Sequence, residues 1–123
     1  MKKRIALLAA LVGVVVTAVA GVATASQSTA QANVITVTAT DFHFKVTRPA
    51  VVKHGVAYTL KFVNKGSALH NIDFQHVKAT KVIAGGGKTE SVKITFPRKG
   101  TYKYVCDVPR HIELGMFGSF KVA

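Results

Sequence analysis

Cysteine is nearly absent from this chain of 123 residues, which contains only Cys106. A single cysteine cannot form a disulfide within the chain. It is therefore an inert buried thiol, half of an intermolecular bridge, or a metal ligand. Exported proteins usually use their cysteines in disulfides, so a lone thiol would be unusual in an exported chain.

Acidic residues are also scarce, with 5 Asp and Glu against 17 Lys and Arg. Three basic residues lie within the first four positions, and the remaining 14 basic and 5 acidic residues give residues 33–123 a net charge of +9. We expect no nucleic-acid partner, because the basic residues form no run with interleaved aromatic residues. The charge is either a solvated cationic surface or a means of attracting acidic protein partners or an anionic cell surface.

Charged residues are missing altogether between Arg4 and Asp41. The basic start at residues 2–4 and the apolar stretch over 5–23 are typical of an export signal. The apolar stretch also comes near the length that spans a bilayer, so an uncleaved membrane anchor is the alternative.

We therefore expect two parts in the chain. Residues 1–32 form a signal peptide, or an uncleaved membrane tether, and a short linker, with small residues suited to cleavage at 23–25 and 30–32. Residues 33–123 form one small folded domain, exported to the periplasm or another place outside the cytoplasm.

A helical period is missing after residue 32, and hydrophobic residues alternate with polar ones instead. The alternating segments are 33–40, 41–46, 57–64, 69–74, 89–96, 101–106 and 117–122. Each is typical of a strand with one face on a core and one in water. Short strands separated by turn residues predict an all-β, Greek-key antiparallel β-sandwich. Segment 75–88 is the least strand-like, and we expect it to be irregular.

The alternation places Cys106 at the end of a strand, on the same face as Tyr102 and Tyr104, so its sulfur should point inward. Pro109 ends this strand, and the chain must then turn. His111 and Met116 lie on that turn, and we expect the loop to bring both side chains toward the sulfur. Met116 has an alternative role as a core residue that fills a gap.

A second histidine, His70, begins another strand and shares its inward face with Ile72 and Phe74. His76 has the same strand parity, but it lies where the strand pattern fades, so we expect it on the surface. Two imidazoles, a thiolate and a thioether match a His₂Cys site with a weak axial Met, the ligand set of blue-copper electron transfer. A closed set of four ligands leaves no position for a substrate, and the chain has no convincing nucleophile–base pair, so we predict no enzyme.

Two blocks of sequence carry a family resemblance: "GVAYTLKFVNKGSALHNIDF" (55–74) and "GTYKYVCDVPRHIELGMFGSFKV" (100–122). They resemble the cupredoxins, the blue type 1 copper proteins that include plastocyanin, azurin and rusticyanin. The resemblance implies a cupredoxin-like fold for residues 33–123 and one bound copper ion. It further implies the following site: equatorial ligands His70, Cys106 and His111, axial ligand Met116, and a supporting residue, Asn71, that ties the strand of His70 to the loop after Cys106.

The chain departs from the family pattern at two positions. Arg110 stands directly before the loop histidine, where many relatives have a small residue. Asp107 follows the cysteine, where relatives often have Ser or Thr, and it either accepts a hydrogen bond from Asn71 or pairs with Arg110. We predict that Asp107 and Asn71 do not bind the metal themselves but hold its ligands in position.

The predicted function is that of a one-electron carrier outside the cytoplasm, with copper cycling between Cu(I) and Cu(II). We expect a monomer whose His111 lies near the surface, where Ile112, Leu114 and Phe117 form a docking patch for redox partners with acidic surfaces. The alternative is a copper carrier, or metallochaperone, that delivers copper to an exported or membrane oxidase.

Overall fold

The computed structural model describes residues 33–78 and 80–123. The predicted signal peptide, its cleavage sites and the alternative membrane anchor fall on residues 1–32, which lie outside the described residues. Within the described part of the chain, no helix has the length and apolar character needed to cross a membrane.

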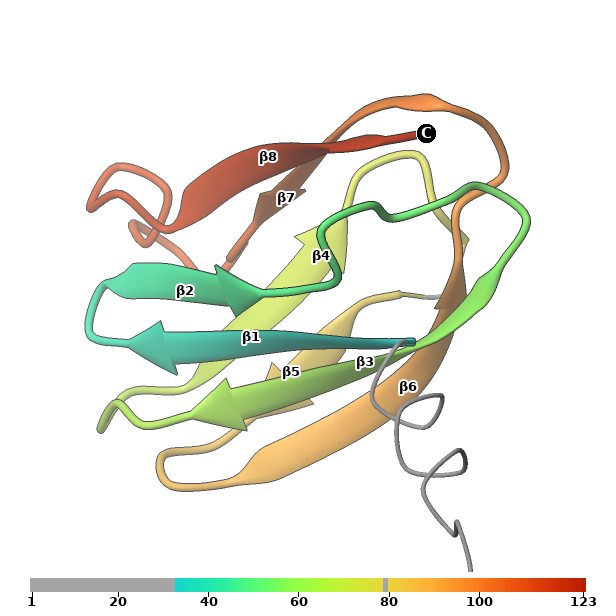
Figure 1. Ribbon diagram of the computed structural model, residues 1–123. Helices are drawn as coiled ribbons and strands as arrows, with labels where there is room; N and C mark the ends of the chain where they lie inside the picture. Colours follow the sequence, from blue (N-terminus) through green and yellow to red (C-terminus); the bar gives the residue numbers. More distant parts are fainter. Residues whose placement is uncertain (1–32, 79) are drawn as a thin grey trace, which may run out of the picture.

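Two four-stranded sheets pack face to face, with the strand orders β2-β1-β3-β6 and β5-β4-β7-β8 (Figure 1). The first sheet consists of β1 (Val34–Thr40), β2 (His43–Thr47), β3 (Ala57–Asn64) and β6 (Thr89–Thr95). The second consists of β4 (His70–Phe74), β5 (Val82–Ala84), β7 (Gly100–Val105) and β8 (Phe117–Val122). The chain crosses between the sheets after β3, β5 and β6. This arrangement confirms the predicted all-β sandwich.

Aromatic rings fill much of the core between the sheets. Phe74 of β4 lies at the centre, with its ring centroid 5.7 Å from Phe96, 5.5 Å from Tyr104 and 5.7 Å from Phe120. Edge-on and tilted pairs of this kind are favourable beyond the area that they bury. Alternation along the strands produces this core, because every second side chain of β3, β4 and β7 points into it.

One strand pair departs from the antiparallel expectation: β1 runs parallel to β3, with Ala39 opposite Asn64. The amide of Lys65 continues this pairing by donating to the carbonyl of Ala39 at 2.8 Å. Parallel strands end at the same edge of a sheet, so the turn at residues 41–42 lies beside the link from β3 to β4. Both lie at the same end of the sandwich as the loop that precedes β8 (Figure 1).

Segment 75–88 contains a strand that the sequence did not predict. Val82–Ala84 forms β5 and pairs with β4 in the register that places Ala84 opposite His70. Three residues are too few to display an alternating pattern, because one period of a strand already takes two of them. The short strand covers the edge of β4 where His70 begins.

Candidate metal centre

Cys106 lies directly after β7 and is completely buried. It lies at the end of the sandwich that also holds the turn at residues 41–42 and the link from β3 to β4 (Figure 1). Its inward orientation confirms the prediction from the alternation of Tyr102 and Tyr104. The backbone amide of Cys106 donates to the carbonyl of Met116 at 2.9 Å, which closes the loop between β7 and β8. From the neighbouring strand, the backbone amide of Asn71 donates to the sulfur Sγ at 3.4 Å.

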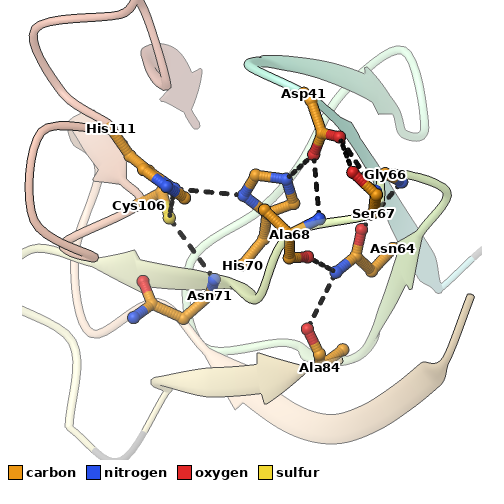
Figure 2. A network of polar contacts seen from close by, with 10 residues as sticks. All are labelled: Asp41, Asn64, Gly66, Ser67, Ala68, His70, Asn71, Ala84, Cys106 and His111. Atoms are coloured by element: carbon orange, nitrogen blue, oxygen red, sulfur yellow. Dashed lines mark hydrogen bonds and ion pairs between the residues drawn. The ribbon is translucent and has the colours of Figure 1, made fainter. Parts of the chain in front are cut away.

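His70 is also completely buried, at the first position of β4. Its ring lies between two partners, as Figure 2 shows. Nδ1 is 3.2 Å from Nδ1 of His111, and Nε2 donates to the carboxylate of Asp41 at 2.6 Å. The strand fixes the backbone of His70, and Asp41 fixes the outer edge of its ring.

His111 reaches the same point from the loop between β7 and β8. Nδ1 lies 3.3 Å from Sγ of Cys106, and only 8% of the residue is exposed. Backbone bonds hold the loop, since the His111 amide donates to Val108 at 3.0 Å and its carbonyl accepts from Met116 at 3.0 Å. Burial, followed by the neighbouring His70, lowers the pKa of His111 below its ordinary value. The neutral imidazole is therefore favoured, and this is the form that binds metal.

The ligand atoms of His70, Cys106 and His111 all lie within 4.8 Å of one another, and all three residues are buried. Bonds of about 2.0–2.3 Å from one ion to nitrogen and sulfur would separate such donors by roughly 3.3–3.8 Å. The two spacings from His111 Nδ1, 3.2 Å to His70 Nδ1 and 3.3 Å to Cys106 Sγ, are close to this range. The donors therefore fit one ion. The assignment of these three residues as its ligands stays a prediction.

Met116 is completely buried, and its backbone is bonded to both Cys106 and His111. This places the residue at the base of the loop, beside two of the three clustered donors. Its role as an axial ligand stays a prediction.

Asn71 and Asp107 form a polar clamp behind Cys106. The side-chain amide of Asn71 donates to Asp107 Oδ1 at 2.6 Å, and the Asp107 backbone amide donates back to Asn71 Oδ1 at 3.0 Å. Asp107 also forms an ion pair with Lys81, and not with Arg110. The hydrogen bond from Lys81, followed by that from Asn71, holds the pKa of Asp107 below its usual value. Of the two roles open to Asp107 from the sequence, the bond to Asn71 is the one the structure contains.

Two residues at this site were missed by the sequence analysis, Asp41 and Phe42. Phe42 packs edge-on against both histidines, with its ring centroid 4.8 Å from His111 and 5.9 Å from His70. Asp41 bonds His70 across 29 positions of sequence. Only the parallel pairing of β1 with β3 brings this turn to the site, and no local pattern indicates that pairing.

The link between β3 and β4 is organised by Asn64, which is almost completely buried. Its side-chain amide donates to the carbonyls of Ala68 and Ala84, each at 2.8 Å, and its Oδ1 accepts from the Gly66 amide at 2.9 Å. One side chain thus shapes the turn and ties it to β5. His70 begins β4 directly after this fixed turn.

The remaining histidines lie on the surface, which confirms the prediction made for His76. His43, His54 and His76 are exposed. Around the buried donors, exposed hydrophobic side chains lie on the surface at this end: Leu69, Ile112, Leu114 and Phe117. Three of them are the residues predicted to form a docking patch.

The chemistry of the donors identifies the ion that suits the site. Imidazole and thiolate together bind zinc as well as copper. A thioether is a soft ligand that selects copper. Met116 is the candidate to supply one, because it is buried and its backbone is hydrogen-bonded to Cys106 and His111. The site fits one copper ion.

Comparison with known proteins identifies the family and shows the same fold elsewhere. A profile of the family described as cupredoxin-like domain matches residues 10–117. Curated proteins give no match. Among solved structures, auracyanin from the photosynthetic bacterium Roseiflexus castenholzii, in its dithionite-reduced form, is similar at 21% identity and a TM-score of 0.60, covering 74% of this chain and 97% of that one.

Two further solved structures share the fold. Auracyanin A, a blue copper protein from the green thermophilic photosynthetic bacterium Chloroflexus aurantiacus, is 23% identical with a TM-score of 0.58, covering 73% of this chain and 98% of that one. A chain of a heme-copper terminal oxidase dimer is 20% identical with a TM-score of 0.60, covering 73% of this chain and 63% of that one. The family match spans most of the sequence, and the chain therefore belongs to the cupredoxin-like domain family.

Proposed function

We propose that this protein is a mononuclear blue copper protein that carries single electrons. His70, Cys106 and His111 are the equatorial ligands in this proposal, and Met116 is the axial ligand. The observation that carries it is the convergence of three buried donors within 4.8 Å at one end of the sandwich. Copper bound there supplies a one-electron couple between Cu(I) and Cu(II).

The protein's own contribution is to hold the donors still. His70 is fixed by β4 and by Asp41, and the sulfur of Cys106 accepts a bond from the amide of Asn71. Donor side chains that are buried and held by hydrogen bonds have little freedom to move when the charge of the copper ion changes. A site that changes little on electron transfer is suited to rapid exchange of electrons.

Electrons are proposed to enter and leave at His111. This is the one clustered donor with some exposure, 8%, and its Nε2 has no hydrogen-bond partner among the described residues. The exposed Ile112, Leu114 and Phe117 come from the same loop and the start of β8. A redox partner with an apolar patch bordered by acidic groups matches this surface and the net charge of +9 over residues 33–123.

The proposed setting is outside the cytoplasm. Residues 1–32 are proposed to serve as an export signal or membrane tether, and residues 33–123 as the monomeric copper domain. The basic start and the long apolar stretch of the sequence support this division. In this proposal the four ligands leave no free coordination position on the copper ion. We also propose no nucleophile–base pair beside the cluster among residues 33–78 and 80–123, so the protein acts as a carrier and not as an enzyme.

Copper delivery to an oxidase is the second candidate. The likeness to a chain in a heme-copper terminal oxidase dimer favours a protein that works beside such an enzyme. A delivery protein must release copper readily, whereas an electron carrier must retain it through many cycles. Competition with a chelator at neutral pH separates the two, since rapid loss of copper supports delivery.

Voltammetry of the purified copper-loaded protein tests the first proposal. A reversible one-electron wave that persists over repeated cycles is the expected result. An irreversible wave, or loss of copper on reduction, would contradict it. Cys106→Ser is the matched variant, because it keeps the size of the side chain and removes the thiolate.

A further inference from the structure

We infer that Asp41 is a positioning residue of the metal centre. Its carboxylate fixes His70 in the tautomer whose Nδ1 faces the other ligands, and its negative charge behind the ring favours Cu(II) over Cu(I). The inference rests on the proposed copper function, and it assigns control of the copper site to a turn that lies outside the ligand loop.

The first support is the hydrogen bond itself. Nε2 of His70 lies 2.6 Å from Oδ1 of Asp41, and the histidine is completely buried. An ionised carboxylate only accepts hydrogen bonds, so the ring must carry its hydrogen on Nε2. Nδ1 of the neutral ring is then left with a free lone pair, and it faces Nδ1 of His111 at 3.2 Å.

The carboxylate is held in place by the turn opposite. Oδ2 accepts from the backbone amide of Ser67 at 2.9 Å and from its hydroxyl at 2.6 Å, while Oδ1 also accepts from the amide of Ala68 at 3.3 Å. These bonds fix both oxygens, as Figure 2 shows. Asp41 therefore presents a fixed negative charge to the back of His70.

Gly66 shows how closely the turn packs against this pair. A Cβ atom at Gly66 would lie 2.2 Å from Oδ1 of Asp41 and 3.0 Å from Nε2 of His70. Gly86, in the next loop, has the same restriction, because a Cβ there would lie 2.8 Å from the carbonyl of Ser67. A side chain at Gly66 would displace the Asp41–His70 pair, and one at Gly86 would push against the turn that holds this pair.

The negative charge of Asp41 affects which oxidation state of copper the site favours. A carboxylate bonded to the far nitrogen of a ligating imidazole raises the basicity of that ligand and fixes its orientation. The raised basicity and the nearby negative charge stabilise the more highly charged ion, Cu(II), more than Cu(I). The alternative is that Asp41 only caps the turn at residues 66–68, in which case the copper site would not respond to its charge.

The test compares Asp41→Asn with Ser67→Ala in the copper-loaded protein. Asp41→Asn keeps the size and removes the charge, whereas Ser67→Ala removes one hydrogen bond from the turn and leaves the bond to His70. For Asp41→Asn we expect Cu(II) affinity to fall about 10- to 100-fold, the usual effect of losing such a partner. We expect a smaller loss for Cu(I), and each tenfold difference raises the reduction potential by about 59 mV. Ser67→Ala keeps the charge of Asp41 and its bond to His70, so it should shift the potential by much less than Asp41→Asn does.

An unchanged potential in Asp41→Asn, or the same shift in both variants, would overturn the inference. Nitrogen NMR of the metal-free wild-type protein gives a second readout that needs neither copper nor a variant. We expect His70 to carry its hydrogen on Nε2, and a hydrogen on Nδ1 would overturn the inference even if Asp41→Asn fails to fold. A wild-type protein without a blue copper spectrum would overturn the proposed function instead. The NMR measurement of the His70 tautomer would still test whether Asp41 positions that ring.

Discussion

The backbone amide of Cys106 donates to the carbonyl of Met116 at 2.9 Å, so the two ends of the ligand loop are joined to each other. His111 lies between them and bonds back to Met116 at 3.0 Å. The loop therefore carries its candidate ligands on a closed, hydrogen-bonded frame. The sandwich supplies the fourth candidate ligand, His70, from the start of β4.

The aromatic core should be the main source of stability. Phe74→Ala removes a ring that is 1% exposed and contacts Phe96, Tyr104 and Phe120. We expect the free energy of unfolding to fall by about 3–5 kcal/mol, measured by urea denaturation of the metal-free protein. The matched control is Phe117→Ala, which is 61% exposed and should change stability by less than about 0.5 kcal/mol. Equal effects would contradict the placement of the core.

Gly118 should tolerate no side chain. A Cβ at this position would lie 2.3 Å from the hydroxyl oxygen of Tyr104 and 2.5 Å from its ring. Gly118→Ala must displace Tyr104 from the core, and we expect a loss of about 1–3 kcal/mol in the same denaturation experiment. Ser119→Ala, exposed on the same strand, is the control and should be neutral. A neutral Gly118→Ala would show that Tyr104 packs elsewhere.

The clamp between Asn71 and Asp107 should stabilise the loop after Cys106. Asn71→Ala removes the acceptor of the Asp107 amide and the donor to its carboxylate. We expect a loss of about 1–3 kcal/mol in the metal-free protein, since Asn71 is only 4% exposed. Asn33→Ala changes an exposed residue and serves as control. If Asn71→Ala and Asn33→Ala both unfold at the same urea concentration as the wild type, the clamp contributes nothing to the stability of the protein.

Copper should stabilise the folded protein through the clustered donors. A ligand at 100 times its dissociation constant adds about 2.7 kcal/mol to the free energy of unfolding, provided that it binds only the folded state. Differential scanning calorimetry with and without copper should show this gain in the wild type and its loss in His70→Ala. His76→Ala alters an exposed histidine and should keep the full gain. A gain that survives in His70→Ala would place the metal elsewhere.

Much of this structure could be predicted from local patterns. The alternation in β3, β4 and β7 identified which side chains face the core, and it placed Cys106 and His70 on buried positions at strand ends. Period-two patterning determines such faces because adjacent side chains of a strand point in opposite directions.

The features that were missed depend on contacts between distant segments. The sequence pattern of a strand does not show which other strand it will pair with, so the parallel pairing of β1 with β3 could not be predicted. This pairing brings Asp41 to His70. The Lys81–Asp107 ion pair likewise joins segments 26 positions apart. Strand β5 was missed because three residues carry too little pattern.

The visible absorption spectrum of the copper-loaded protein is the sharpest test of whether the thiolate of Cys106 binds copper together with His70 and His111. We expect an intense blue thiolate-to-copper band in the wild type and no such band in Cys106→Ser at the same copper loading. A colourless wild-type complex, or a band that persists in Cys106→Ser, would contradict it.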